Sequence, residues 1–150
     1  MKITLTELHV GTCSTVTTIA FDEKDLAGDF LDSLEQSRPQ DATKFQTAFS
    51  TICDVKNYSN DTKFKNLGDG IYEVKIWGKR LYCFKDTSGD FEEATGCSNH
   101  MIMACCGGSK NAKKEQNRDI NKALGLKKKY FKAKGEDDTE SKYIKTDDEN

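Results

Sequence analysis

The sequence predicts an α+β fold: a small, antiparallel (mixed) β-sheet packed against an N-terminal αα-hairpin and a basic C-terminal helix. Three observations predict it: β-branched and alternating residues up to position 21, apolar residues at helical spacing over 26–52, and a lysine-rich helical pattern over 113–132. The chain has 150 residues, of which 35% are apolar, enough for one domain with an arm. We expect one domain over 1–135 and a disordered acidic tail over 136–150, because the tail combines low hydrophobicity with high charge.

The first 22 residues predict a hairpin and the start of a helix. Residues 3–10 alternate apolar and polar side chains, and residues 15–21 are rich in β-branched types, so both predict strands. Asp22 can cap a helix that begins directly after it. The pair Arg38-Pro39 ends that helix, because a residue before proline avoids the α region.

A second helix is expected after the proline. Asp41 can cap it. Its apolar residues recur at helical spacing and predict an inward-facing stripe. The stripe consists of Phe45, Phe49 and Ile52. Together the two helices predict an αα-hairpin with an acidic outer face.

Residues 71–77 and 80–85 predict two strands joined by the two-residue loop Gly78-Lys79. This loop sets Trp77 opposite Arg80. Because cross-strand partners project to the same side, one face of the hairpin carries charged and aromatic side chains. They are Glu73, Lys75, Trp77, Arg80, Tyr82 and Phe84. The other face is apolar and is expected to pack on helices.

Three further segments complete the expected fold. Residues 64–70 contain two glycines and predict a turn that leads into the hairpin. Residues 101–106 form an unbroken apolar run, which predicts a buried central strand that Gly107-Gly108 ends. Residues 113–132 predict a basic helix. Its expected buried side is Ile120, Ala123, Leu124, Tyr130 and Phe131.

The cysteines and histidines predict neither a metal site nor a cofactor site. The six cysteines include no C-x-x-C spacing, and zinc ligands usually come in spaced pairs. No apolar run approaches the roughly 18 residues of a membrane span, and the first residues do not resemble a signal peptide. We therefore expect a cytoplasmic protein without a membrane or small-molecule cofactor partner.

Charge is segregated along the chain. Residues 63–85 carry six basic and two acidic groups, and residues 100–135 carry ten basic and two acidic groups. The segments 1–62, 86–99 and 136–150 are all net acidic. Such polarity is typical of a surface that attracts a polyanion. The alternative is a solvated, lysine-rich helix without a partner.

The charged face of the hairpin has two interpretations. A cation beside an exposed aromatic ring can hold a nucleotide, because the base stacks and the phosphate is neutralised. The alternative is a half-exposed sheet face with cross-strand ion pairing, for instance of Glu73 with Lys75 or Arg80.

Three stretches resemble the RelE/ParE toxin superfamily, and most closely its HigB-like, phage-derived Gp49-like branch. The first is the run Phe64-Lys-Asn-Leu-Gly-Asp-Gly-Ile-Tyr-Glu-Val-Lys-Ile. The second is Arg80-Leu-Tyr-Cys-Phe. The third is an apolar strand that ends in Lys110, followed by Lys113-Lys114 and by Asp119-Ile120 with Ala123. The order of elements also agrees over about residues 24–132, whereas Gln116 stands where the family usually has proline.

The resemblance implies a RelE-like fold and the toxin of a type II toxin–antitoxin system, a ribosome-dependent mRNA endoribonuclease that inhibits translation. Its partners would be a cognate antitoxin, the ribosome and mRNA. The implied catalytic residues are Lys75, Arg80 and Lys110, with Arg80 clamping the scissile phosphate. The implied RNA-binding residues are Glu73, Trp77, Tyr82, Lys113, Lys114 and Arg118.

Two other functions remain open on the same fold. One is a non-catalytic RNA- or protein-binding module, as in phages or mobile elements, which the missing proline and the acidic tail favour. The other is a gyrase-inhibiting, ParE-like toxin, which needs no ribonuclease residues.

Overall fold

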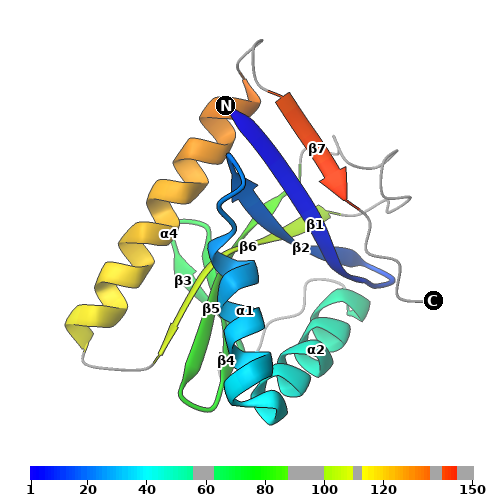
Figure 1. Cartoon of the computed structure of the whole chain (residues 1–150), viewed down its shortest axis with the longest axis vertical. Helices are drawn as coiled ribbons and strands as arrows, with labels where there is room; N and C mark the ends of the chain where they lie inside the picture. The colour runs from blue at the N-terminus through cyan, green and yellow to red at the C-terminus, as the bar shows by residue number, and fades with distance from the viewer. Residues whose placement is uncertain (56–62, 88–99, 110–112, 136–139, 145–150) are drawn as a thin grey trace.

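The computed structural model describes residues 1–55, 63–87, 100–109, 113–135 and 140–144. These residues form an α+β structure whose strands make one seven-stranded mixed sheet. Figure 1 shows the sheet with α1 and α2 on one side and α4 on another. The elements in chain order are β1 (Lys2–Val10), β2 (Ser14–Phe21), α1 (Leu26–Ser37), α2 (Pro39–Asp54), β3 (Phe64–Gly68), β4 (Ile71–Ile76), β5 (Lys79–Asp86), β6 (His100–Ser109), α4 (Lys113–Lys134) and β7 (Glu140–Ile144).

The sheet has the strand order β3-β4-β5-β6-β2-β1-β7. Strands β3 to β6 pair antiparallel, β2 runs parallel to β6, and β1 pairs antiparallel with β2. The predicted N-terminal hairpin is therefore confirmed, and it continues the main sheet. The run 101–106 lies inside β6 between β5 and β2, as expected for a buried central strand.

Helices cover both faces of the sheet. The αα-hairpin packs on one face, where Phe45, Phe49 and Ile52 join Val74 and Leu81 in one core cluster. Helix α4 packs on the other face in a second cluster. Its members include Tyr82, Phe84, Met103, Ala123 and Tyr130. The face of the β4–β5 hairpin that carries Glu73 and Arg80 is thus the face that α4 partly covers.

The helix starts differ from the sequence prediction. Asp25, and not Asp22, caps α1, because its side chain accepts a hydrogen bond from the Gly28 amide at 2.8 Å. Asp22 instead accepts from the Lys2 amide at 2.8 Å and holds the end of β1. Helix α2 begins at Pro39, and Asp41 forms an ion pair with Arg38 at 2.7 Å in place of a cap.

Three other expectations need correction. Residues 64–68 form β3, an edge strand, because they find a partner in β4. Gly107-Gly108 continues β6 to Ser109, because Lys79 and Arg80 of β5 pair with this segment. The sequence predicts that Phe131 is buried, but it is 40% exposed, and only part of its ring packs on Phe84.

The acidic segment 136–150 contributes a strand. Within it, Glu140–Ile144 forms β7 and pairs parallel with β1, although composition predicts disorder. The rest of this segment lies outside the described residues. Among the helices that are described, none is long and apolar enough to cross a membrane.

Candidate nucleic-acid interface

The tip of the β4–β5 hairpin differs from the sequence prediction. Ile76 pairs with Lys79, so the loop is Trp77-Gly78, one residue earlier than predicted. Lys75 therefore lies opposite Arg80. The strand pairing shifts by two residues, and because side chains alternate with a period of two, every strand residue keeps its predicted face.

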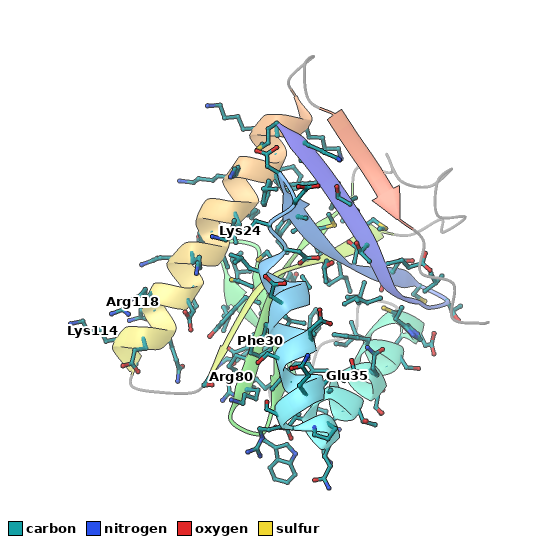
Figure 2. The ribbon with its side chains drawn as sticks, viewed as in Figure 1. Lys24, Phe30, Glu35, Arg80, Lys114 and Arg118 are labelled. Carbon is teal, nitrogen blue, oxygen red and sulfur yellow. The ribbon has the colours of Figure 1, made fainter. Side chains whose placement is uncertain are left out.

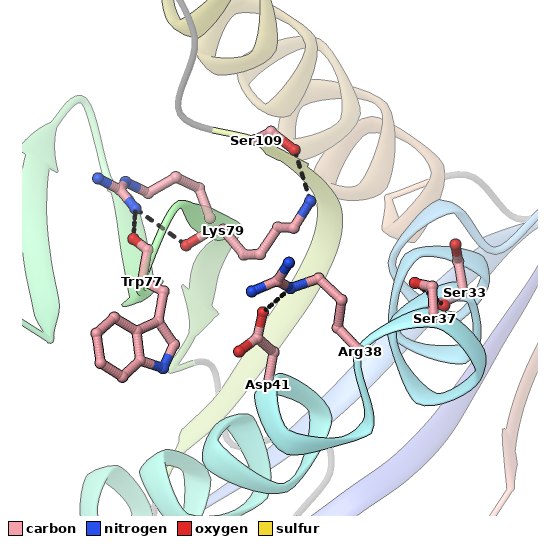
Figure 3. A network of polar contacts seen from close by, with 8 residues as sticks. Ser33, Ser37, Arg38, Asp41, Trp77, Lys79 and Ser109 are labelled. Atoms are coloured by element: carbon pink, nitrogen blue, oxygen red, sulfur yellow. Dashed lines mark hydrogen bonds and ion pairs between the residues drawn. The ribbon is translucent and has the colours of Figure 1, made fainter.

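The guanidinium of Arg80 is held by its own hairpin. Its Nε lies 3.1 Å from Glu73 Oε1. Its Nη1 donates to the carbonyl oxygens of Trp77 at 2.8 Å and of Lys79 at 3.1 Å, the two contacts at the hairpin tip in Figure 3. Arg80 and Glu73 are each only 7% exposed. The charge of Arg80 is therefore neutralised locally, and its guanidinium fastens the turn.

Tyr82 lies beside this ion pair, on the face that α4 covers. Its side chain is fully buried, and burial together with the nearby carboxylates of Glu73 and Asp119 raises the pKa of Tyr82 to about 12. Its hydroxyl has no hydrogen-bond partner among the residues that the structure describes. Tyr82 is a core residue in this structure, so its ring is not presented to a base.

Trp77 is the most exposed of the predicted aromatic side chains, with 69% of its surface accessible. Its φ is +53°, in the left-handed region, which costs a bulky residue about 1–2 kcal/mol. The indole lies against α2, because Lys44 Nζ is 5.3 Å from the ring centroid. The sequence predicts that Trp77 shares the face of Arg80. This prediction is wrong, because Trp77 lies in the loop and its indole turns toward the αα-hairpin.

Three exposed cations mark the beginning of α4. Lys113, Lys114 and Arg118 are all exposed, and Figure 2 shows Lys114 and Arg118 projecting away from the sheet. We call these three residues the α4 cation cluster. Lysines in the first turn oppose the helix macrodipole, whose N-terminal end is positive and favours anions. The cluster is therefore a surface of concentrated positive potential.

The α4 cation cluster lies near the tip of the β4–β5 hairpin, because both the tip and the start of α4 contact the end of β6. Lys79 Nζ donates to Ser109 Oγ at 2.9 Å, at the last residue of β6. Asp119 of α4 lies so close to Gly108 that a Cβ there would collide with its carboxylate. The first turns of α4 thus lie beside Arg80, which pairs with Gly108. Lys110, predicted to contact phosphate, lies outside the described residues.

Sequence reasoning missed a hollow of about 480 Å³ between α2 and the end of β4. We call it the α2–β4 hollow. Its described lining residues are Lys44, Thr47, Ala48, Thr51, Ile52, Lys63, Lys75, Ile76 and Trp77. The spacing of Lys44, Thr47 and Thr51 puts all three on one helix face, which is the signal that could have identified α2 as one wall.

Five cysteines lie among the described residues, and four of them are buried. Within the described residues, no group of three or more histidine, cysteine or acidic side chains could hold a metal ion. Burial raises the pKa of the Cys83 thiol, and a hydrogen bond with Cys106 raises that of Cys105. Raised pKa values keep the Cys83 and Cys105 thiols protonated, so these two are poor nucleophiles at neutral pH. The hydrogen bond with Cys105 lowers the pKa of the Cys106 thiol, which is buried.

Comparison of the chain with protein-family models, curated proteins and solved structures gave no match.

Proposed function

We propose that this protein is a non-catalytic RNA-binding module on a RelE-like scaffold, and that the α4 cation cluster contacts the RNA backbone. The observation that carries this proposal is the contrast between exposed and occupied cations. Lys113, Lys114 and Arg118 are exposed, whereas Arg80 is buried in an ion pair with Glu73. Exposed lysines and arginines supply the salt-dependent part of nucleic-acid affinity.

The order of elements supports the scaffold. An αα-hairpin, a set of antiparallel strands and a basic C-terminal helix follow one another as in the sequence resemblance. The apolar face of the β4–β5 hairpin packs on the αα-hairpin through Val74 and Leu81. The polar face of the hairpin lies on the side of the sheet that α4 partly covers. The N-terminal hairpin β1–β2, the insert 86–100 and the acidic C-terminal segment, which contains β7, are additions to that order.

RNA binding is tested by fluorescence anisotropy of a labelled single-stranded RNA at several salt concentrations. The triple variant Lys113→Gln, Lys114→Gln, Arg118→Gln should flatten the slope of log K against log salt by about 0.7 per lost phosphate contact. The matched control carries Lys122→Gln, Lys128→Gln and Lys132→Gln, which removes three exposed charges from the same helix. If both variants flatten the salt dependence of RNA affinity equally, the result would contradict a site at the start of α4.

A second candidate is the ribosome-dependent mRNA endoribonuclease toxin, held inactive by an antitoxin. The observation that favours it is the pairing of Lys75 directly opposite Arg80. Cleavage by the RNA 2′-hydroxyl needs a proton acceptor and stabilisation of the charged phosphorane. Lys75 is only half-buried and would serve as the base or as a phosphate contact, while Arg80 would first have to leave Glu73.

The two functions separate in a growth experiment. The chain is induced in a bacterium, and mRNA 5′ ends are mapped for the wild type and for Lys75→Ala. New 5′ ends that disappear in Lys75→Ala would establish cleavage, and unchanged mRNA would leave the binding function. Arg80→Ala is unsuitable as the single test, because it also breaks a buried ion pair. Lys65→Ala, at an exposed lysine on the edge strand β3, is the control.

A further inference from the structure

The α2–β4 hollow combines three features: an apolar floor, an aromatic wall and cations. Ala48, Ile52 and Ile76 are buried apolar residues at its lining. Trp77 forms a wall with most of its indole exposed. Lys44 lines the opposite side and holds its ammonium 5.3 Å from the indole centroid.

The charged residues among the described lining of the hollow are all basic. Lys44, Lys63 and Lys75 are among its described lining residues, and none of the described lining residues carries a carboxylate. Strand alternation puts the Lys75 side chain on the Arg80 face, so Lys44 and Lys63 supply the charge on the α2 side. Positive charge in a concave, partly apolar site raises the local concentration of anions. The volume of about 480 Å³ lies within the usual range for small-ligand sites. The hollow therefore suits a small anion that also has an apolar part.

The backbone at Trp77 adds an independent argument. This residue occupies the left-handed region at φ +53°, although glycine, which adopts that conformation freely, is the next residue in the loop. Bulky residues persist in such conformations where the surrounding structure requires them, and these positions gather at ligand sites. The conformation directs the indole toward α2 and away from the ion pair of Arg80, so it creates the aromatic wall.

We propose that the α2–β4 hollow binds a nucleotide, with the base stacked on Trp77 and the phosphate held by Lys44 and Lys63. Stacking on an exposed aromatic ring is tolerant of base identity, and lysine neutralises phosphate as a point charge. The same chemistry fits a free mononucleotide and one unpaired nucleotide of an RNA chain. The site uses none of the residues of the α4 cation cluster, so it stands or fails separately from the proposed function.

Trp77 is the only tryptophan of the chain, so its fluorescence reports on this site directly. The full-length protein is titrated with adenosine 5′-monophosphate, with adenosine, with inorganic phosphate and with an oligouridylate, with excitation at 295 nm. We expect saturable quenching by the monophosphate, at a midpoint at least tenfold lower than with adenosine. Saturation by the oligouridylate alone, lost in Lys44→Gln, would assign the bound nucleotide to an RNA chain.

Matched lysine variants decide whether the hollow is the site. Lys44→Gln and Lys63→Gln should each raise the midpoint at least fivefold. Lys65→Gln should leave it within twofold, because Lys65 is exposed but does not line the hollow. Circular dichroism checks that all three variants stay folded. Linear, non-saturating quenching by every titrant, or equal effects in the three variants, would overturn the proposal.

Discussion

Arg80 and Glu73 form an ion pair on the α4 side of the sheet, with Nε 3.1 Å from Oε1 and both side chains buried. Two strands are bridged by this contact, since Glu73 lies in β4 and Arg80 in β5. A buried pair adds little net stability over an apolar pair, but removal of one partner leaves an uncompensated charge. The arginine that the family resemblance marks as catalytic is thus also a structural residue.

The first prediction concerns this pair. Arg80→Ala should lower the free energy of unfolding by about 3 kcal/mol, because it leaves the Glu73 carboxylate buried without its counter-charge. The double variant Glu73→Gln, Arg80→Gln should lose less, because no charge remains. Urea denaturation followed by circular dichroism measures both. The control is Lys75→Ala, which removes the half-buried cation directly opposite Arg80. If Arg80→Ala is as stable as this control, the ion pair does not stabilise the fold.

The faces of the hairpin were predictable, but its register was not. Alternation in β4 and β5 assigns each side chain to a face, and a shift of two residues preserves that assignment. The position of the loop was ambiguous because Gly78 suits either loop position. The sequence favoured Gly78-Lys79, whereas the structure places Trp77 at φ +53°. Strain of this kind at a bulky residue leaves no trace in composition or periodicity.

The second prediction concerns the buried hydroxyl of Tyr82. Tyr82→Phe should keep or raise the free energy of unfolding, by up to about 1 kcal/mol, because it removes a polar group that has no partner among the described residues. The pKa of Tyr82 is raised to about 12 from an ordinary value near 10. In the wild type, stability should therefore fall as the pH rises from about 10 to 12, because only the unfolded chain ionises there.

The loss of stability at alkaline pH can be assigned to Tyr82 by comparison with the phenylalanine variant. Thermal melts of the wild type and of Tyr82→Phe at pH 8, 10 and 11 are compared, and the gap between the two should widen with pH in favour of the variant. Tyr72→Phe serves as the matched control, because Tyr72 lies on the other face of β4 and is half-buried. A gap that stays constant with pH would contradict the raised pKa.

The third prediction concerns the anchor of the C-terminal end of α4. Asp86, at the end of β5, is 2.6 Å from Lys134 Nζ and accepts a hydrogen bond from the Tyr130 hydroxyl at 2.5 Å. Asp86→Ala should lower the free energy of unfolding by about 2–4 kcal/mol, because it leaves Lys134 and the Tyr130 hydroxyl without their buried carboxylate partner. Lys134→Met should lower the free energy of unfolding by less. Exposed Lys132, exchanged for methionine on the same turn, should change stability by less than about 0.5 kcal/mol.

The helix–sheet contacts explain why some sequence signals misled. Gly107 and Gly108 suggested the end of a strand, but they are small because two side chains pack directly on them. A Cβ on Gly107 would collide with the Phe30 ring of α1, and one on Gly108 with Asp119 of α4. Such close approach is tertiary and depends on both layers at once. Residue type predicts Asp22 as the cap of α1, but Asp22 accepts from the Lys2 amide of β1, and Asp25 accepts from the Gly28 amide instead.

The final prediction concerns Trp77, whose replacement should change both the free energy of unfolding and nucleotide binding. Trp77→Gly should raise the free energy of unfolding by up to about 1 kcal/mol, because glycine adopts φ +53° without a steric penalty. Trp77→Ala is the matched control, since it also removes the indole but keeps the Cβ that makes this conformation costly. Urea denaturation should therefore rank glycine above alanine. Both variants should lose the binding of a fluorescently labelled nucleotide, and a glycine variant that is less stable than the alanine variant would show that Trp77 is not strained.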